Sequence, residues 1–160
     1  MTELQATISR RTLTNYGSFF VARSMYEKGK GFIGAALLVD RQNGHPSVVL
    51  HLLCQGIEII LKAMLLEIDY DYYKPLLRKF GHDLPKTAKA VRNATSLHVF
   101  PPRIHVELQT LSNFYRQHLL RYASNFDIFI DVRTIPSKRV LLHITALIRY
   151  LERKKTFTEQ

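Results

Sequence analysis

The sequence predicts an all-α protein: an up-and-down bundle of four to five helices, with a short extended arm before the last helix. Apolar residues recur at helical spacing in several segments, and one segment is apolar on nearly every side. Neither an alternating strand–helix pattern nor a glycine-rich phosphate loop is present, which excludes a Rossmann or P-loop domain. The 160 residues suit one domain, which we place at 17–155 between a weakly ordered arm at 1–16 and a flexible tail at 156–160.

The first predicted helix extends from about residue 18 to residue 39. Its apolar face drifts along its length, and it contains three glycines, Gly29, Gly31 and Gly34. Glycine weakens a helix but allows another backbone to come close, so we expect a bend or a close helix contact here. Turn-forming residues follow, and Pro46 suits the first turn of the next helix.

The second predicted helix, residues 47–67, has one narrow polar stripe on an otherwise apolar surface. Its polar residues are separated by four, three and four positions and therefore share one face: His51, Gln55, Glu58 and Lys62. Glu58 precedes Lys62 by four residues, the order that favours an ion pair. A helix this apolar must be surrounded by others, so we expect it at the centre of the bundle. The same polar groups would be costly in lipid, which argues against a membrane span.

Capping residues and prolines predict two further helices downstream. A tyrosine-rich segment, residues 69–75, breaks the helical pattern and is predicted to be a loop or short turn. Asp83 can cap a third helix, which ends near residue 94. The prolines at 101 and 102 start a fourth helix, which we extend from residue 101 to about residue 122.

In the last part of the chain, the spacing of apolar residues changes before a final helix. Apolar and polar residues alternate from 126 to 135, which predicts an extended arm or an edge strand. Ser137 then caps a last helix, whose apolar face contains Leu141, Ile144 and Ile148.

The charge of the protein favours a polyanionic partner. Its formal net charge is +10 and its sequence pI is near 9.9, which is typical of proteins that meet nucleic acid, nucleotides or an anionic membrane face. A basic surface without a partner is the alternative. The single cysteine, Cys54, excludes an intrachain disulfide, and the N-terminus lacks the apolar core of a secretory signal. We therefore expect a cytoplasmic protein.

Three short motifs, in this order along the chain, resemble the HEPN superfamily, the higher eukaryote and prokaryote nucleotide-binding helical domains. Residues 53–63, Leu-Cys-Gln-Gly-Ile-Glu-Ile-Ile-Leu-Lys-Ala, are similar to the family helix that contains glutamate and then leucine-lysine-alanine. Residues 81–84, Gly-His-Asp-Leu, are similar to the His-Asp-Leu turn of one branch of the family. Tyr115 and the Arg121-Tyr122 pair resemble the end of a later family helix, where Ala123 replaces the usual proline. The resemblance covers residues 18–152.

This resemblance implies an up-and-down helical bundle that is often a homodimer. It implies either binding of RNA or a nucleotide without chemistry, or a metal-independent RNase of toxin and defence systems. An antitoxin or a nucleotidyltransferase is the protein partner that the family implies. No metal or other cofactor is expected from it, and no zinc pattern of Cys and His is present in the sequence.

Arg92 and His98 are the candidate catalytic pair. The catalytic branch of the family has an arginine followed four to six residues later by a histidine, and these two residues have that spacing. A histidine can take the proton of a ribose 2′-hydroxyl while an arginine stabilises the charge that develops on phosphorus. Such a spacing also arises by chance in a chain with many arginines, and a loop without a function is the alternative.

Candidate binding residues come from the polar stripe, the Gly-His-Asp-Leu turn and the predicted fourth helix. His118 and Arg121 are three residues apart and would share a face of that helix, and with the stripe they would line one groove between helices. Mutual pairing of these buried polar groups is the structural alternative, and for Asp83 helix capping is an alternative role. Basic residues of the predicted third helix could contact phosphates. The candidate set is Glu58, Lys62, His82, Asp83, Lys86, Lys89, His118 and Arg121.

Three hypotheses remain open at this point. The first is a HEPN-like module that binds RNA or a nucleotide without catalysis, as a homodimer. The second is a metal-independent RNase that uses Arg92 and His98. The third is a helical protein-interaction module whose basic surface docks an acidic partner and whose polar stripe is purely structural.

Overall fold

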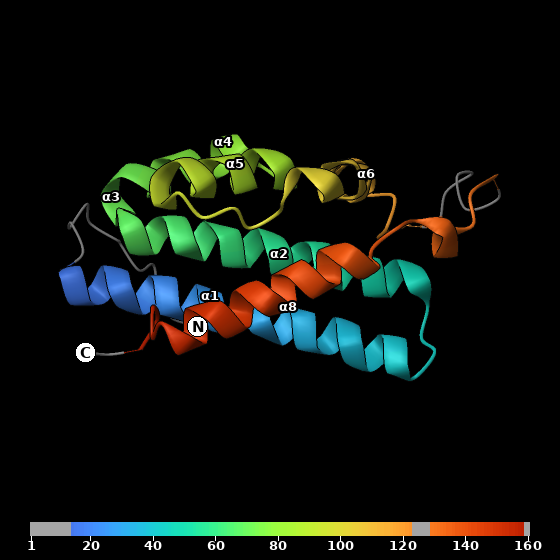
Figure 1. The fold of residues 1–160 in the computed structure, drawn as a ribbon, viewed down its shortest axis with the longest axis horizontal. Helices are drawn as coiled ribbons and strands as arrows, with labels where there is room; N and C mark the ends of the chain where they lie inside the picture. Colours follow the sequence, from blue (N-terminus) through green and yellow to red (C-terminus); the bar gives the residue numbers. More distant parts are fainter. Residues whose placement is uncertain (1–13, 123–128, 159–160) are drawn as a thin grey trace, which may run out of the picture.

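The protein is all-α, and its core is an antiparallel pair of long helices. The computed structural model describes residues 14–122 and 129–158, and those residues form helices and connecting segments without a strand. Helices α1 (Asn15–Arg41) and α2 (Pro46–Ile68) form the pair (Figure 1). The helical bundle that the sequence predicts is thus confirmed.

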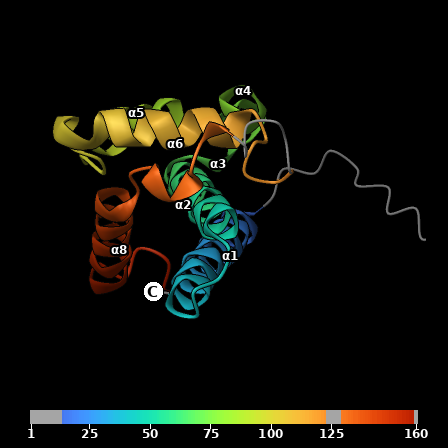
Figure 2. The same ribbon diagram turned by 90° about the vertical axis from the view of Figure 1, so that its right-hand side faces the viewer.

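The remaining helices cover α2 from two directions (Figures 1 and 2). A layer of shorter helices packs on one side of α2, and α8 with α1 packs on the other. The elements of the layer are α3 (Tyr70–Tyr73), η1 (Lys74–Leu76), α4 (Leu77–Phe80), α5 (Leu84–Thr95), η2 (Pro102–Ile104) and α6 (His105–Arg116). After a short 3-10 turn, η3 (Val132–Thr134), the chain enters α8 (Lys138–Arg153).

Helix α2 is the central element of the fold, as its apolar sequence predicts. Most of its residues are buried, including Leu53, Ile57 and Leu61, which are at most 2% exposed. Among the described residues it is the one helix long and apolar enough to cross a membrane, and 61% of that window is buried inside the fold. Contacts with neighbouring helices therefore account for its hydrophobicity.

Two glycines allow α1 and α2 to pack closely. A Cβ atom added to Gly56 would lie 2.6 Å from Ile33 Cδ1 and 3.0 Å from the Gly29 carbonyl oxygen. A Cβ added to Gly29 would lie 3.2 Å from the Gly56 carbonyl oxygen. The expected close helix contact thus occurs at Gly29, where it depends on the absence of side chains at both positions. A Cβ atom added to Gly31 or to Gly34 would meet nothing within 4 Å.

Two segments differ from the sequence prediction in their local structure. The tyrosine-rich segment 69–75 forms α3 and most of η1, because the Asp69 side chain caps this turn by accepting a hydrogen bond from Tyr72 N at 3.0 Å. Of the predicted extended arm at 126–135, residues 126–128 lie outside the described residues. The remainder contains the 3-10 turn η3, in which Asp131 Oδ1 accepts from Arg133 N at 3.0 Å. The prediction of a strand is wrong for this part.

The structure describes part of each predicted chain end. Of the predicted N-terminal arm, residues 1–13 lie outside the described residues, and α1 already includes Asn15 and Tyr16 because Thr14 caps it. Of the predicted C-terminal tail, residues 159–160 lie outside the described residues. Phe157, in contrast, is 6% exposed and stacks on Tyr26, with 4.3 Å between ring centroids. Aromatic burial thus holds this part of the tail against α1.

Candidate functional site

A buried carboxylate, Glu58 of α2, is the centre of a network that joins α2 to the layer of shorter helices. Lys62 Nζ donates to Glu58 Oε1 at 2.6 Å, and His82 Nδ1 is 2.9 Å from Glu58 Oε2. Tyr115 Oη of α6 donates to the same Oε2 atom at 2.7 Å. The Glu58 residue is only 7% exposed. A carboxylate with three donors is stable inside a protein because each partner compensates for lost hydration.

Glu58 and Lys62 of the polar stripe take part in this network, so the stripe faces inward, as predicted. Its neighbours are placed by the turn between α4 and α5, in which Gly81 has a left-handed φ of 56°. Lys62 Nζ donates to the Gly81 carbonyl oxygen at 2.8 Å, which ties the turn to α2. Gln55 Oε1 accepts a second, longer contact from Tyr115 Oη at 3.2 Å. His82, immediately after Gly81, is thereby held against Glu58.

The electrostatics of the network favour an ionised Glu58. Burial raises the pKa of Glu58, but the hydrogen bonds from His82, Lys62 and Tyr115 outweigh burial and hold this pKa below its ordinary value. Burial, together with the hydrogen bond to Glu58, raises the pKa of Tyr115 well above its ordinary value. The phenol therefore stays protonated and keeps donating to the carboxylate.

A rim of cationic and imidazole groups borders the network. The His82 and His118 rings lie 5.8 Å apart, and the His82 side chain is 42% exposed. Burial lowers the pKa of His51, as do the positive charges of Arg121, His118 and His82. These four groups thus lie close enough to interact electrostatically. The Arg121 side chain is exposed and forms no hydrogen bond or ion pair with the described residues.

The predicted position of His118 and Arg121 on a helix is wrong. Helix α6 ends at Arg116, well before residue 122. His118 has a left-handed φ of 59°, an uncommon backbone conformation outside glycine, and it redirects the chain into turns that carry Arg121. Both residues still lie near the polar stripe, but a turn and not a shared helix face brings them there.

Two of the candidate binding residues have clear structural roles. Asp83 Oδ1 caps α5 by accepting from Lys86 N at 2.9 Å, and Asp83 Oδ2 pairs with Arg116 at 3.1 Å. The Lys86 ammonium group donates to the Lys79 carbonyl oxygen at 2.8 Å. Capping of α5 by Asp83 is confirmed, and Lys86 is engaged at the end of α4.

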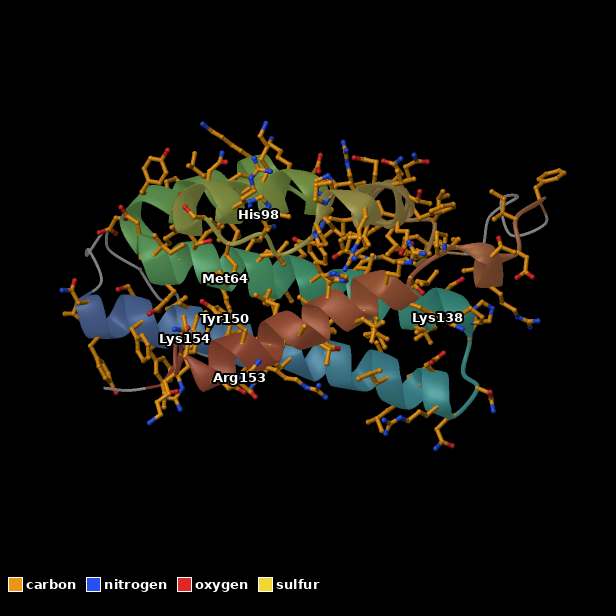
Figure 3. The ribbon with its side chains drawn as sticks, viewed as in Figure 1. Met64, His98, Lys138, Tyr150, Arg153 and Lys154 are labelled. Atoms are coloured by element: carbon orange, nitrogen blue, oxygen red, sulfur yellow. The ribbon has the colours of Figure 1, made fainter. Side chains whose placement is uncertain are left out.

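The candidate catalytic pair lies away from Glu58, in a pocket between α5 and α6. This pocket has a volume of about 250 Å³, and Arg92 and His98 both line it. Lys89 of α5 and His105 of α6 line the same pocket. Figure 3 labels His98 on the segment that connects these two helices. The structure therefore brings the pair together around one cavity within a single chain.

Sequence reasoning missed two of the residues that matter at these sites. Tyr115 fits the apolar face of its helix, and its contact with Glu58 had no local signal because the two residues are 57 positions apart. His105 looked isolated behind two prolines, yet it shares a pocket with Arg92. The order of the three motifs was a usable signal for Tyr115, because it placed this residue at the start of the third motif.

The described residues contain no group of three or more His, Cys, Asp or Glu side chains that could hold a metal ion. Comparisons with protein-family models, with curated proteins and with solved structures found no match to this chain. The chemistry of the two sites is therefore the basis for a functional conclusion.

Proposed function

We propose that the protein is a HEPN-like helical module that binds RNA or a nucleotide through the basic layer, residues 77–122. This layer contains eight Lys and Arg residues against two acidic residues, so it carries a net +6 of the total +10. It also contains four of the seven histidines. A concentration of positive charge on one side of the fold is the electrostatic feature that attracts a phosphate backbone.

Both acidic residues of the basic layer are already engaged. Asp83 pairs with Arg116, and Glu107 approaches Arg139 of α8 at 3.6 Å. Lys79, Lys89 and Arg92 are exposed, and no ion pair with a described residue neutralises them. Most of the positive charge of the layer is therefore available to a ligand.

The three motifs of the family resemblance come together at Glu58, which supports the HEPN-like assignment. Glu58 and Lys62 come from the first motif, His82 from the second and Tyr115 from the third. Residues of all three motifs thus meet in one hydrogen-bonded network, as the resemblance leads us to expect. In this proposal the network fixes the basic layer on α2, and the protein is a cytoplasmic homodimer with an antitoxin or nucleotidyltransferase partner.

Binding of a single-stranded oligoribonucleotide tests the proposal. We expect affinity to fall steeply with salt, because each neutralised phosphate releases counterions. Replacing Lys79, Lys89 and Arg92 together by glutamine should weaken binding and make the slope of log affinity against log salt shallower by about 2. Fluorescence anisotropy at several salt concentrations measures both quantities.

The matched control replaces three exposed cations on the α1–α8 side by glutamine: Lys28, Arg149 and Lys154. It changes the net charge equally but leaves the basic layer intact, so the affinity should change much less. Equal loss in both triple variants would mean that total charge, and not the basic layer, attracts RNA. Absence of RNA or nucleotide affinity at physiological salt would instead favour the protein-interaction module, with a structural polar stripe.

A metal-independent RNase is the second candidate, favoured by the shared pocket of Arg92 and His98. His98 would take the proton of a 2′-hydroxyl, whose oxygen then attacks phosphorus while the 5′-oxygen leaves and takes a proton from water. Arg92 would stabilise the charge on the phosphoryl oxygens. We expect RNA cleavage that persists in EDTA and is lost in His98→Ala and in Arg92→Ala. Cleavage that survives in both variants would eliminate this candidate.

A further inference from the structure

The pocket between α5 and α6 is formed by residues that recur at helical spacing on two facing helices. Lys89 and Arg92 are three residues apart on α5 and so lie on one face. His105 and Leu108 are related in the same way on α6. The segment between the helices contributes His98.

The segment that carries His98 is held in place by local hydrogen bonds. Ser96 adopts a left-handed φ of 60° at the end of α5, and its N–H donates to the Arg92 carbonyl oxygen at 2.8 Å. Thr95 Oγ1 donates to the Val91 carbonyl oxygen at 2.8 Å and accepts from Leu97 N at 3.1 Å. The chain therefore turns back immediately after α5. This turn is what returns a residue only six positions beyond Arg92 to the same pocket.

The ring of His105 is oriented by the same segment. Its Nε2 atom is 3.0 Å from the Phe100 carbonyl oxygen. Because a carbonyl oxygen only accepts hydrogen bonds, Nε2 carries the proton and Nδ1 is the nitrogen that remains for a ligand. A protonated His105 can therefore donate from Nδ1 without losing its anchor.

The charges of the pocket select an anion. Its polar lining includes one lysine, one arginine and two histidines, and no carboxylate is among the described residues that line it. The apolar part of the lining includes Val99, Phe100 and Leu108, which are at most 6% exposed. The volume of about 250 Å³ is below the roughly 300–1,000 Å³ of most ligand pockets. A small anionic group fits this combination better than a large apolar ligand.

We propose that this pocket is a phosphate-binding site, with Lys89 and Arg92 as its fixed cations and His98 and His105 as hydrogen-bond donors. The inference deepens the proposed function, on which it rests for the source of the phosphate, an RNA or a nucleotide. Arginine and lysine suit this role because they form charge-assisted hydrogen bonds to phosphate oxygens. Lys89, already a candidate binding residue from the sequence, and His105 thereby join Arg92 and His98 as ligand-binding residues.

The test is a titration of the 160-residue chain with inorganic phosphate. Binding is monitored through the imidazole NMR signals of its histidines. We expect saturable shifts of the His98 and His105 signals at constant pH and ionic strength. Arg92→Gln should weaken phosphate binding about tenfold, as loss of a charge-assisted contact predicts. Lys89→Gln should weaken it as well. The matched control, Arg149→Gln on α8, removes an exposed arginine outside the pocket and should leave the affinity unchanged.

Two outcomes would overturn the inference: shifts spread evenly over histidines outside the pocket, or equal affinity in Arg92→Gln and Arg149→Gln. A second arm repeats the titration with the single-stranded oligoribonucleotide. RNA binding without response of His98 and His105 would retain the proposed function and reject the phosphate pocket. Phosphate binding in the pocket without RNA or nucleotide affinity would support the site and reject the proposed function. The two failures are thus distinguishable.

Discussion

Glu58→Ala is expected to destabilise the protein by about 3–5 kcal/mol, the usual cost of removing one partner of a buried ion pair. The Lys62 side chain is only 13% exposed and would keep the Gly81 carbonyl oxygen as its remaining acceptor. His82 and Tyr115 would lose the same carboxylate. Urea unfolding followed by circular dichroism measures the change in the free energy of unfolding.

Two variants identify the cause of this loss. The double variant Glu58→Leu with Lys62→Met removes both charges, so it should be much more stable than Glu58→Ala. Glu27→Ala removes an exposed glutamate that pairs with Lys30 and should change stability by less than about 1 kcal/mol. If Glu58→Ala were no more destabilising than Glu27→Ala, the network would not hold the basic layer on α2.

Gly56→Leu is expected to destabilise the protein by about 1–3 kcal/mol or more, because it overpacks the contact between α1 and α2. The new Cβ would lie 2.8 Å from Ile33 Cγ1 and 3.0 Å from the Gly29 carbonyl oxygen. Ile33 can change its rotamer, but the backbone oxygen moves only if α1 moves. Thermal and urea unfolding should both show the loss.

Gly31→Ala is the matched control in the same helix pair. Gly31 is exposed inside α1, and an added Cβ would meet nothing within 4 Å. Alanine is a better helix former than glycine, so this variant should gain about 0.5–1 kcal/mol. Stability gains of similar size in both variants would show that α1 and α2 do not need glycine where they cross.

Local pattern was enough to predict much of the fold. The apolar sequence of α2 places it at the centre, and the spacing from His51 to Lys62 places its polar residues on one face, since both follow from the geometry of one helix. Asp83 as a helix cap could be predicted for the same reason. The end of α6 could not, because the left-handed turn at His118 leaves no clear signal in composition.

The candidate sites were predictable only in part. The Glu58–Lys62 pair follows from i,i+4 spacing. The polar stripe and the spacing of His118 and Arg121 suggested a groove that includes Glu58, His82 and Arg121. Burial lowers the pKa of His51, and the charges of Arg121, His118 and His82 lower it further. No local pattern paired Tyr115 with Glu58, although the third motif began at Tyr115, and nothing in the sequence paired Lys89 or His105 with His98.

The sequence by itself determined the helical class, the central helix and the inward polar stripe, because these depend on the periodicity of neighbouring residues. The tertiary structure alone decided that Tyr115 completes the Glu58 network, that Phe157 covers Tyr26 and that His105 joins Arg92 in one pocket. Each of those contacts depends on how helices far apart in the chain pack, and packing depends on the shapes of both partners at once.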